Sequence, residues 1–309
     1  MKIIRIGTRG SKLAMWQAHH VAGRITALGA GSEIVVIRTV GDHVQQAPVG
    51  QIGLKGVFIK ELEEALLSGE VDLAVHSMKD VPTEIAAGLA IVAIPPRADP
   101  RDALVSRGGE TLEALPTAAR IGTSSLRRQA QLLKARPDLA VLAMRGNVDK
   151  RLAKLDRGEF DAIVLACAGL QRLGASQRVT QVLSPEICLP AVGQGALGIE
   201  AREADQEVVR LLEPLDDRAT RAAIRCERTV MAAMQGGCQL PLGAWARLDD
   251  GHLVLDAVVL SADGSECLRR SGRGRHDDPE GLGRRVAQEL FAAGAERILQ
   301  LTGRSRAAL

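Results

Sequence analysis

The order of hydrophobic and polar residues in the first third of the chain alternates between two periods. Short runs rich in isoleucine and valine, at residues 3–6, 33–39 and 71–75, have the composition of buried strands. Residues 12–28 and 58–68 instead carry apolar positions at helical spacing, with polar residues between them. Strands that alternate with helices in this way predict an α/β unit built on a parallel sheet.

A second unit of the same kind follows a proline-rich linker at residues 95–100. Three helices are expected in this unit. One ends at about residue 135, the next contains Lys150 and Arg151, and a short third helix carries Arg172. Its predicted strands are residues 103–106, 120–122, 139–144 and 161–166. A further predicted strand at residues 195–200 follows this unit in the chain.

The two units share a short sequence echo at one strand-to-helix turn. Residues 6–11 of the first unit and residues 121–125 of the second both place a Gly-Thr pair and serine hydroxyls at this turn. The echo predicts two similar domains that face each other across a cleft.

From about residue 217 the pattern changes. A predicted helix to residue 235 is followed by strands at 243–248 and 252–260, which flank the hairpin signal Asp249-Asp250-Gly251. A third strand at 267–272 and a helix at 279–293 complete a small α+β domain with a three-stranded antiparallel sheet. The expected domains are residues 1–96 with 196–214, residues 101–191, and residues 217–309.

Length and composition fit a soluble protein of two or three domains. The chain has 309 residues, of which 46% are hydrophobic and 25% charged, with a net charge of +3. Three Phe, two Trp and no Tyr leave few rings for stacking on bases, so a nucleic-acid partner is not expected. No apolar run reaches membrane-spanning length and no signal-peptide core is present. These features predict a cytoplasmic protein with no membrane partner.

The five cysteines are odd in number and widely spaced, without a CxxC pair. Neither a disulfide framework nor a structural zinc site is expected, and a reducing compartment fits best. The pair His19-His20 lies in a predicted helix with no ligand partner in register, so no metal site is predicted.

Basic residues gather directly after the predicted strands. Open α/β sheets bind ligands at this edge, and arginine matches the geometry of carboxylate or phosphate. The alternative is a set of solvated surface charges with Thr123 or Ser124 as a simple helix cap. We favour a cleft that binds a polyanion, lined by Arg9, Lys55, Lys79, Arg127, Arg128, Arg145, Arg151 and Arg172.

Asp80 is the one acidic residue among these bases. It could cap the turn before Pro82, which is the common role of an aspartate in a loop. A fixed carboxylate in a basic cleft would repel an anion but stabilise a cation formed during a reaction, which indicates catalysis. The neighbouring His76 could act as a base, although a histidine satisfied within the core is the favoured interpretation.

The segment Gly236-Gly237-Cys238 presents a thiol in a tight loop. Its two glycines free the backbone, and Pro241 prevents the preceding helix from resuming. A free cysteine is commonly a small buried hydrophobic residue. Spacing alone does not separate Cys238 from the other four cysteines.

Several motifs in fixed order resemble the hydroxymethylbilane synthase family, also called porphobilinogen deaminase. The resemblance covers essentially the whole chain. The motifs are Val75-His76-Ser77-Met78-Lys79-Asp80-Val81-Pro82, Gly122-Thr123-Ser124-Ser125-Leu126-Arg127-Arg128, Arg145-Gly146-Asn147-Val148, Leu189-Pro190-Ala191-Val192-Gly193-Gln194-Gly195 and Gly236-Gly237-Cys238-Gln239.

The resemblance implies an enzyme of tetrapyrrole biosynthesis. Members of the family join four porphobilinogen units head to tail with release of ammonia, and then free the linear tetrapyrrole by hydrolysis. Growth begins on a dipyrromethane cofactor held by a thioether, and Cys238 matches the cysteine that carries it. The implied fold has two domains that resemble type II periplasmic binding proteins, around a cleft, plus a third small domain. The family suggests a monomer.

The resemblance also implies roles for individual residues. Asp80 matches the catalytic aspartate, and Phe58 matches a phenylalanine that packs against the substrate ring. The residues matched to cofactor binding, besides Cys238, are Lys79, Asp80, Ser77, Thr123, Ser124, Ser125, Arg127, Arg128, Arg145 and Gly146. The residues matched to substrate binding are Arg9, Ser11, Phe58, Arg145, Arg151, Arg172 and Gln194.

The main alternative is a non-catalytic, two-lobed binding protein for a small polyanion. Such a protein would explain the basic cleft but not Asp80 within it, the third domain or the Cys238 loop. It would also normally carry an export signal. The enzyme is therefore the favoured interpretation.

Overall fold

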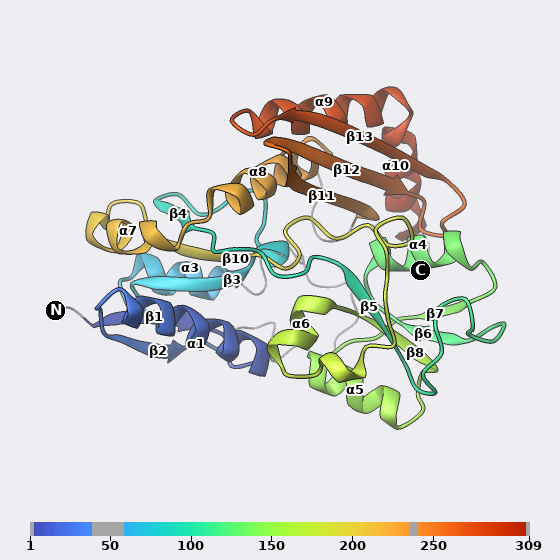
Figure 1. The fold of residues 1–309 in the computed structure, drawn as a ribbon, viewed down its shortest axis with the longest axis horizontal. Coiled ribbons are helices and arrows are strands. Elements are labelled where there is room, and N and C mark those ends of the chain that lie inside the picture. Colours follow the sequence, from blue (N-terminus) through green and yellow to red (C-terminus); the bar gives the residue numbers. More distant parts are fainter. Residues whose placement is uncertain (1–2, 39–58, 235–239, 307–309) are drawn as a thin grey trace. The chain divides into compact units, whose positions relative to one another are not determined.

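The computed structural model describes residues 3–38, 59–234 and 240–306. The chain divides into two compact units, one of Met1–Arg97 with Ala196–Arg221 and one of Ala98–Gly195 with Ala222–Leu309. Figure 1 shows the elements of each unit along the chain. Within the described residues no helix is long and apolar enough to cross a membrane.

The first unit is a five-stranded mixed sheet with helices on both faces (Figure 1). Its strand order is β2-β1-β3-β10-β4. The strands are β1 (Ile4–Thr8), β2 (Ser32–Val36), β3 (Leu73–Ser77), β4 (Leu89–Ala93) and β10 (Leu197–Arg202). The helices are α1 (Lys12–Ala27), α3 (Lys60–Leu67) and α7 (Gln206–Leu212), with short 3-10 turns η1 (Met78–Asp80) and η3 (Glu213–Leu215).

The two faces of this sheet have separate cores because side chains alternate along each strand. Helices α1 and α7 pack on the face that carries Leu73 and Val75. Helix α3 packs on the opposite face, where Leu62 and Leu66 contact Ala74.

The second unit contains a sheet of the same topology, in the order β7-β6-β8-β5-β9. Its strands are β5 (Asp102–Ser106), β6 (Arg120–Gly122), β7 (Ala140–Leu142), β8 (Ala162–Ala166) and β9 (Gln181–Val182). Its helices are α4 (Leu126–Ala135), α5 (Val148–Asp156) and α6 (Cys167–Arg172), with the 3-10 turn η2 (Ser176–Arg178). Leu132 of α4 packs on one face, and Leu155 of α5 and Leu170 of α6 pack on the other.

The sequence echo corresponds to equivalent places in the two sheets. Strands β1 and β6 hold the same position in the strand order, and each leads into a helix. Ser11 and Ser125 accept hydrogen bonds from backbone N–H groups in the first turns of α1 and α4 and so cap those helices.

Both sheets are mixed, which corrects the expectation of parallel sheets. Strand β10 is antiparallel to β3 and β4, and β5 is antiparallel to β8 and β9. The pattern of strand and helix predicts the elements but contains no information on a strand that enters the sheet from a distant part of the chain.

The rest of the second unit is the predicted small α+β part. It contains β11 (Leu242–Asp249), β12 (His252–Leu260) and β13 (Cys267–Arg275), with α9 (Pro279–Ala292), α10 (Ala295–Arg306) and all but the first turn of α8 (Arg218–Ala233). The three strands form an antiparallel sheet in chain order. Asp250 and Gly251 have positive φ angles of 46° and 72°, as the predicted hairpin turn requires.

Candidate functional site

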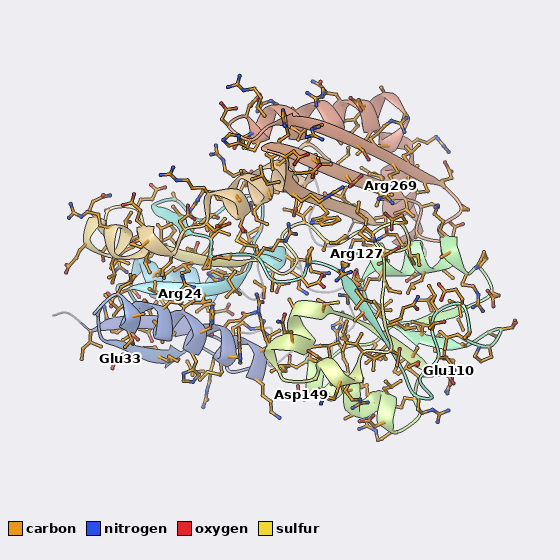
Figure 2. All side chains as sticks on the ribbon, viewed as in Figure 1. Arg24, Glu33, Glu110, Arg127, Asp149 and Arg269 are labelled. Carbon is orange, nitrogen blue, oxygen red and sulfur yellow. The ribbon has the colours of Figure 1, made fainter. Side chains whose placement is uncertain are left out.

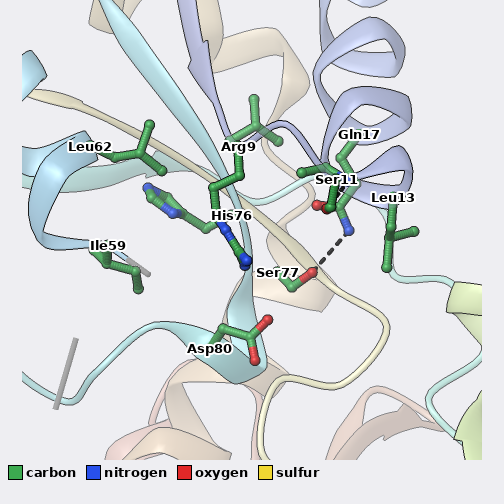
Figure 3. Close-up of a pocket in the computed structure, with 11 residues that line it drawn as sticks. Arg9, Ser11, Leu13, Gln17, Ile59, Leu62, His76, Ser77 and Asp80 are labelled. Carbon is green, nitrogen blue, oxygen red and sulfur yellow. Dashed lines mark hydrogen bonds between the residues drawn. The ribbon is translucent and has the colours of Figure 1, made fainter. Parts of the chain in front are cut away.

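A pocket in the first unit lies at the carboxyl ends of two parallel strands. Strands β1 and β3 are neighbours, so the residues after them meet at one edge of the sheet. The pocket is open to solvent and has a volume of about 80 Å³. Its lining residues, most of them labelled in Figure 3, are Arg9, Ser11, Leu13, Ala14, Gln17, Ile59, Leu62, Val75, His76, Ser77 and Asp80.

Four of the predicted site residues are brought together in this pocket. Arg9 comes from the turn after β1, Ser11 caps α1, Ser77 ends β3, and Asp80 ends the turn η1. Figure 3 shows the carboxylate of Asp80 at one side of the pocket and the side chain of Arg9 beside it. Asp80 is exposed, so its carboxylate is accessible to a bound molecule.

Gln17 is a pocket residue that the sequence interpretation missed. It is 3% exposed, and its Nε2 donates a hydrogen bond to Ser77 Oγ at 2.9 Å (Figure 3). A glutamine among the apolar positions Ala18 and Val21 of an amphipathic helix is the signal that could have identified it. Its contact fixes the hydroxyl of Ser77 between α1 and β3.

In the second unit, the hydroxyls of the predicted Thr-Ser-Ser segment take part in local hydrogen bonds. Thr123 Oγ1 accepts from Ser125 N at 3.2 Å. Ser124 Oγ donates to Met144 O at 2.7 Å and accepts from Met144 N at 3.0 Å. Ser125 caps α4, so the segment forms the rigid entry to this helix.

Arg127 and Arg128 lie inside the second unit and pair with Asp102. Arg127, labelled in Figure 2, has its Nη1 2.8 Å from Asp102 Oδ2 and is 3% exposed. Arg128 donates from Nε at 3.0 Å and from Nη2 at 2.7 Å to Asp102 Oδ1. Gln194 Nε2 also donates to Asp102 Oδ1, at 2.9 Å. We call these four residues the Asp102 cluster.

The electrostatics of the Asp102 cluster leave a positive charge. Burial would raise the pKa of Asp102, but the charges of Arg127 and Arg128 outweigh it and hold that pKa well below its usual range. Two guanidinium groups and one carboxylate therefore leave one net positive charge. Arg127 Nε is also buried without a hydrogen-bond partner among the described residues, and such a donor is costly to leave unpaired.

Asp102 itself was not predicted. It begins the apolar strand β5 and is fully buried. An aspartate directly before three apolar strand residues is the signal in the sequence, because a buried carboxylate requires a partner.

The remaining predicted residues of the second unit lie at the ends of its strands and helices. Arg151 Nε donates to the carbonyl of Gly146 at 2.7 Å. Arg172 Nη2 donates to the carbonyl of Gly195 at 2.7 Å, and burial lowers the pKa of Arg172 to about 10, so it stays protonated at neutral pH. The half-buried Arg145 lies between β7 and α5. The half-buried Lys79 lies in the turn η1 of the first unit.

Cys238, Phe58 and Lys55 lie outside the described residues. The other four cysteines are free thiols. Burial raises the pKa of Cys167, Cys188 and Cys226 to about 12, and it also raises the pKa of Cys267. Since the thiolate is the reactive form, these four side chains are poor nucleophiles.

No group of three or more metal-binding side chains occurs within residues 3–38, 59–234 and 240–306. The groups that converge on the two sites are guanidinium, hydroxyl, amide and carboxylate. They can bind a molecule with several carboxylates and, at Asp80, stabilise a positive charge.

Two protein-family models match the chain. The model described as "Porphobilinogen deaminase, dipyromethane cofactor binding domain" matches residues 4–210. The model described as "Porphobilinogen deaminase, C-terminal domain" matches residues 222–292.

Curated proteins with this name are similar over nearly their whole length. Porphobilinogen deaminase of Desulforudis audaxviator (strain MP104C) is 53% identical over 296 residues, which cover 95% of this chain and 96% of that protein. Porphobilinogen deaminase of Syntrophobacter fumaroxidans (strain DSM 10017 / MPOB) is 50% identical over 301 residues, 97% of each chain.

Solved structures of more distant proteins also match part of the chain. A periplasmic substrate-binding protein of an ABC transporter from Coxiella burnetii is 15% identical, with a TM-score of 0.41 over 69% of this chain and 92% of that chain. The periplasmic VFT2 domain of BvgS from Bordetella pertussis is 15% identical, with a TM-score of 0.40 over 68% of this chain and 85% of that chain.

Proposed function

This chain belongs to the porphobilinogen deaminase family, and we propose on that premise which of its residues carry out the family's reaction. The protein is a transferase that condenses porphobilinogen units on a dipyrromethane cofactor. In the proposed reaction, four units are joined head to tail with release of ammonia, and water then frees the linear tetrapyrrole. When bound, the cofactor supplies an electron-rich pyrrole carbon to which the first new unit is added.

Asp80 is the proposed catalytic residue, and its place in the pocket wall is the observation that carries this proposal. Loss of ammonia from porphobilinogen leaves a cation whose charge is shared with the pyrrole nitrogen. An ionised carboxylate beside that N–H stabilises the cation, and it later assists removal of the proton after ring attack. Arg9 and Ser11 in the same pocket are proposed to bind the substrate's carboxylates.

The Asp102 cluster is the proposed support of the cofactor's carboxylates. Each pyrrole carries an acetate and a propionate, so two linked pyrroles bring four negative charges. The net positive charge of the cluster and the unpartnered Arg127 Nε support a role for Arg127 and Arg128 in holding them. The other proposed cofactor-binding residues are Lys79, Asp80, Ser77, Thr123, Ser124, Ser125, Arg145 and Gly146. The other proposed substrate-binding residues are Phe58, Arg145, Arg151, Arg172 and Gln194.

Cys238 is the proposed attachment point of the cofactor. A thioether forms from a thiolate, and the raised pKa values of the other four thiols argue against attachment at any of them. Cys238 is an anchor rather than a turnover nucleophile, since its thioether persists while the product leaves.

The proposed organisation has three domains, residues 1–96 with 196–214, residues 101–191 and residues 217–309. A cytoplasmic location is proposed because four free thiols suit a reducing compartment. The proposed oligomeric state is a monomer, which gel filtration with light scattering tests.

The test of the catalytic role is the variant Asp80→Asn, which keeps the side-chain shape but removes its charge. We expect kcat for porphobilinogen consumption to fall about 10²- to 10³-fold, with thermal stability unchanged, because the lost contact acts on the transition state. Asp277→Asn, at an exposed aspartate paired with Arg275, is the matched control and should keep full activity. A normal rate for Asp80→Asn would remove Asp80 from the mechanism.

A further inference from the structure

A buried histidine–carboxylate pair lies at the pocket of the first unit. His76 Nε2 is 2.9 Å from Glu200 Oε2, and the two side chains are 4% and 1% exposed. His76 is on β3 and Glu200 is on β10, on the same face of the sheet, because His76 is opposite Gly198 and Glu200 is opposite Ala74. The pair thus joins two antiparallel neighbouring strands.

The surroundings of this pair are largely apolar. Helix α3 covers this face of the sheet and contributes Leu62 and Leu66 to the core there. Burial raises the pKa of Glu63 on the same helix, a hydrogen bond from Ala86 N lowers it, and the charge of Glu200 raises it further. The raised pKa of Glu63 indicates that this region is poorly solvated.

A buried pair of this kind is a weak source of stability. Removing the carboxylate and the polar imidazole from water is unfavourable, and the contact between them offsets this only in part. Apolar side chains of similar volume would fill the space under α3 with no such cost. Retention of the pair therefore suggests a role besides packing.

The two nitrogens of His76 have different environments. Nε2 is used by Glu200, whereas Nδ1 has no hydrogen-bond partner among the described residues. The imidazole is at the same time part of the pocket wall, together with Asp80 and Arg9 (Figure 3). A carboxylate that accepts the Nε2 proton holds a neutral imidazole in the tautomer in which Nδ1 is an acceptor.

We propose that Glu200 is a positioning residue that fixes the His76 imidazole, so that His76 Nδ1 accepts a hydrogen bond from the aminomethyl group of porphobilinogen. The proposal rests on the proposed function, in which Asp80 takes the pyrrole N–H. The aminomethyl ammonium is the remaining N–H donor of this substrate, since its other polar groups are carboxylates. His76 is thus a substrate-binding residue and Glu200 acts through it.

Two substitutions at position 76 separate the pocket contact from the buried pair. The amide of glutamine reaches the place of Nε2, so His76→Gln retains a partner for Glu200 but lacks an acceptor at Nδ1. The amide of asparagine lies near the place of Nδ1, so His76→Asn retains the pocket-side acceptor but leaves the Glu200 carboxylate without its donor. Holoenzyme purified with its cofactor is used for each variant.

The proposal predicts that KM for porphobilinogen rises about tenfold in His76→Gln, with kcat within about threefold of wild type and thermal stability unchanged. Glu200→Leu, which removes the acceptor for His76 Nε2, should show the same rise in KM. Glu200→Gln has an amide oxygen that can accept from Nε2, so its KM should stay within about threefold of the wild-type value. A substrate analogue with a methyl group in place of the aminomethyl group should inhibit wild type and His76→Gln equally.

An unchanged KM in His76→Gln would overturn the proposal and show that the pair is purely structural. A loss of stability in Glu200→Leu with an unaltered KM would lead to the same conclusion. If Glu200→Leu does not fold, His76→Gln decides. Weaker inhibition of His76→Gln by the methyl analogue would overturn the assignment to the aminomethyl group. Wild-type enzyme that fails to consume porphobilinogen would instead overturn the proposed function, which keeps the two failures distinct.

Discussion

Asp102 accepts two hydrogen bonds from Arg128 inside the second unit, from Nε at 3.0 Å and from Nη2 at 2.7 Å, where the two side chains are 0% and 7% exposed. Arg127 pairs with the other oxygen of the same carboxylate. The start of β5 is therefore joined to the first turn of α4 by one acid and two bases.

Asp102→Asn should destabilise the protein strongly at neutral pH. The substitution leaves two buried guanidinium groups without their counter-charge, and breaking a buried pair in this way costs about 3–5 kcal/mol. Urea unfolding followed by circular dichroism measures the difference. Asp277→Asn breaks an exposed Arg–Asp pair and should cause no measurable change. Equal stability of the two variants would contradict the structural role of Asp102.

The contribution of Asp102 to the stability of the fold should also depend on pH and should decrease in acid. Its pKa is lower in the folded protein than in the unfolded chain, so the unfolded chain binds more protons in acid. The stability that the carboxylate contributes is fully present above the unfolded pKa of about 3.9 and is lost as the pH falls toward the folded pKa. The difference in the free energy of unfolding between wild type and Asp102→Asn should therefore become smaller below about pH 4. A difference that widens in acid would contradict this assignment.

The four described thiols should resist alkylation in the native protein. At about pH 8, a thiol with a pKa near 12 is ionised in about one molecule in ten thousand. Holoenzyme treated with iodoacetamide should therefore gain almost no label, whereas the same protein unfolded in guanidinium chloride should gain four. Peptide mass spectrometry identifies the sites. Rapid native labelling of Cys167, Cys188 or Cys226 would show that these side chains are more accessible than the structure indicates.

Gly195 and Gly174 provide a matched pair of glycine-to-alanine substitutions. Gly195 has a φ of 88°, and an added Cβ would lie 2.5 Å from the carbonyl oxygen of Ala98, so Gly195→Ala combines backbone strain with a clash. Gly174 has a φ of 65° but open space around it. Gly174→Ala should lower the free energy of unfolding by about 1 kcal/mol. Gly195→Ala should lower it by clearly more, because only this substitution forces the backbone after Gln194 to shift. Similar unfolding free energies for the two variants would refute the close approach at Gly195.

Much of the fold could be predicted from periodicity. The two α/β units and the three-stranded antiparallel sheet are confirmed, with helix boundaries such as Lys12–Ala27 close to the expected 12–28. Strands β4 and β9 and helices α7 and α10 were not predicted. The first three are short, and their patterns are too brief to show a period. The direction of β10 depends on long-range pairing and is not contained in the local pattern.

The site could be predicted in part. Residues that follow β1 and β3 meet in the pocket as expected, because parallel neighbours end at one edge. The sequence could not reveal that Arg127 and Arg128 turn toward a buried Asp102, since the same pattern suits an arginine that faces solvent. Gln17 and Glu200 were missed for a related reason: a single polar residue on an apolar face shows its role only when its partner is known.

The central claim is that Cys238 carries a covalent dipyrromethane cofactor on which porphobilinogen is condensed. The most direct test is the intact mass of the purified chain, wild type and Cys238→Ser, measured together with activity. The wild-type chain should be heavier than its sequence by two porphobilinogen units less two molecules of ammonia, and Cys238→Ser should have the unmodified mass and no activity. An unmodified wild-type chain that is fully active would contradict the claim.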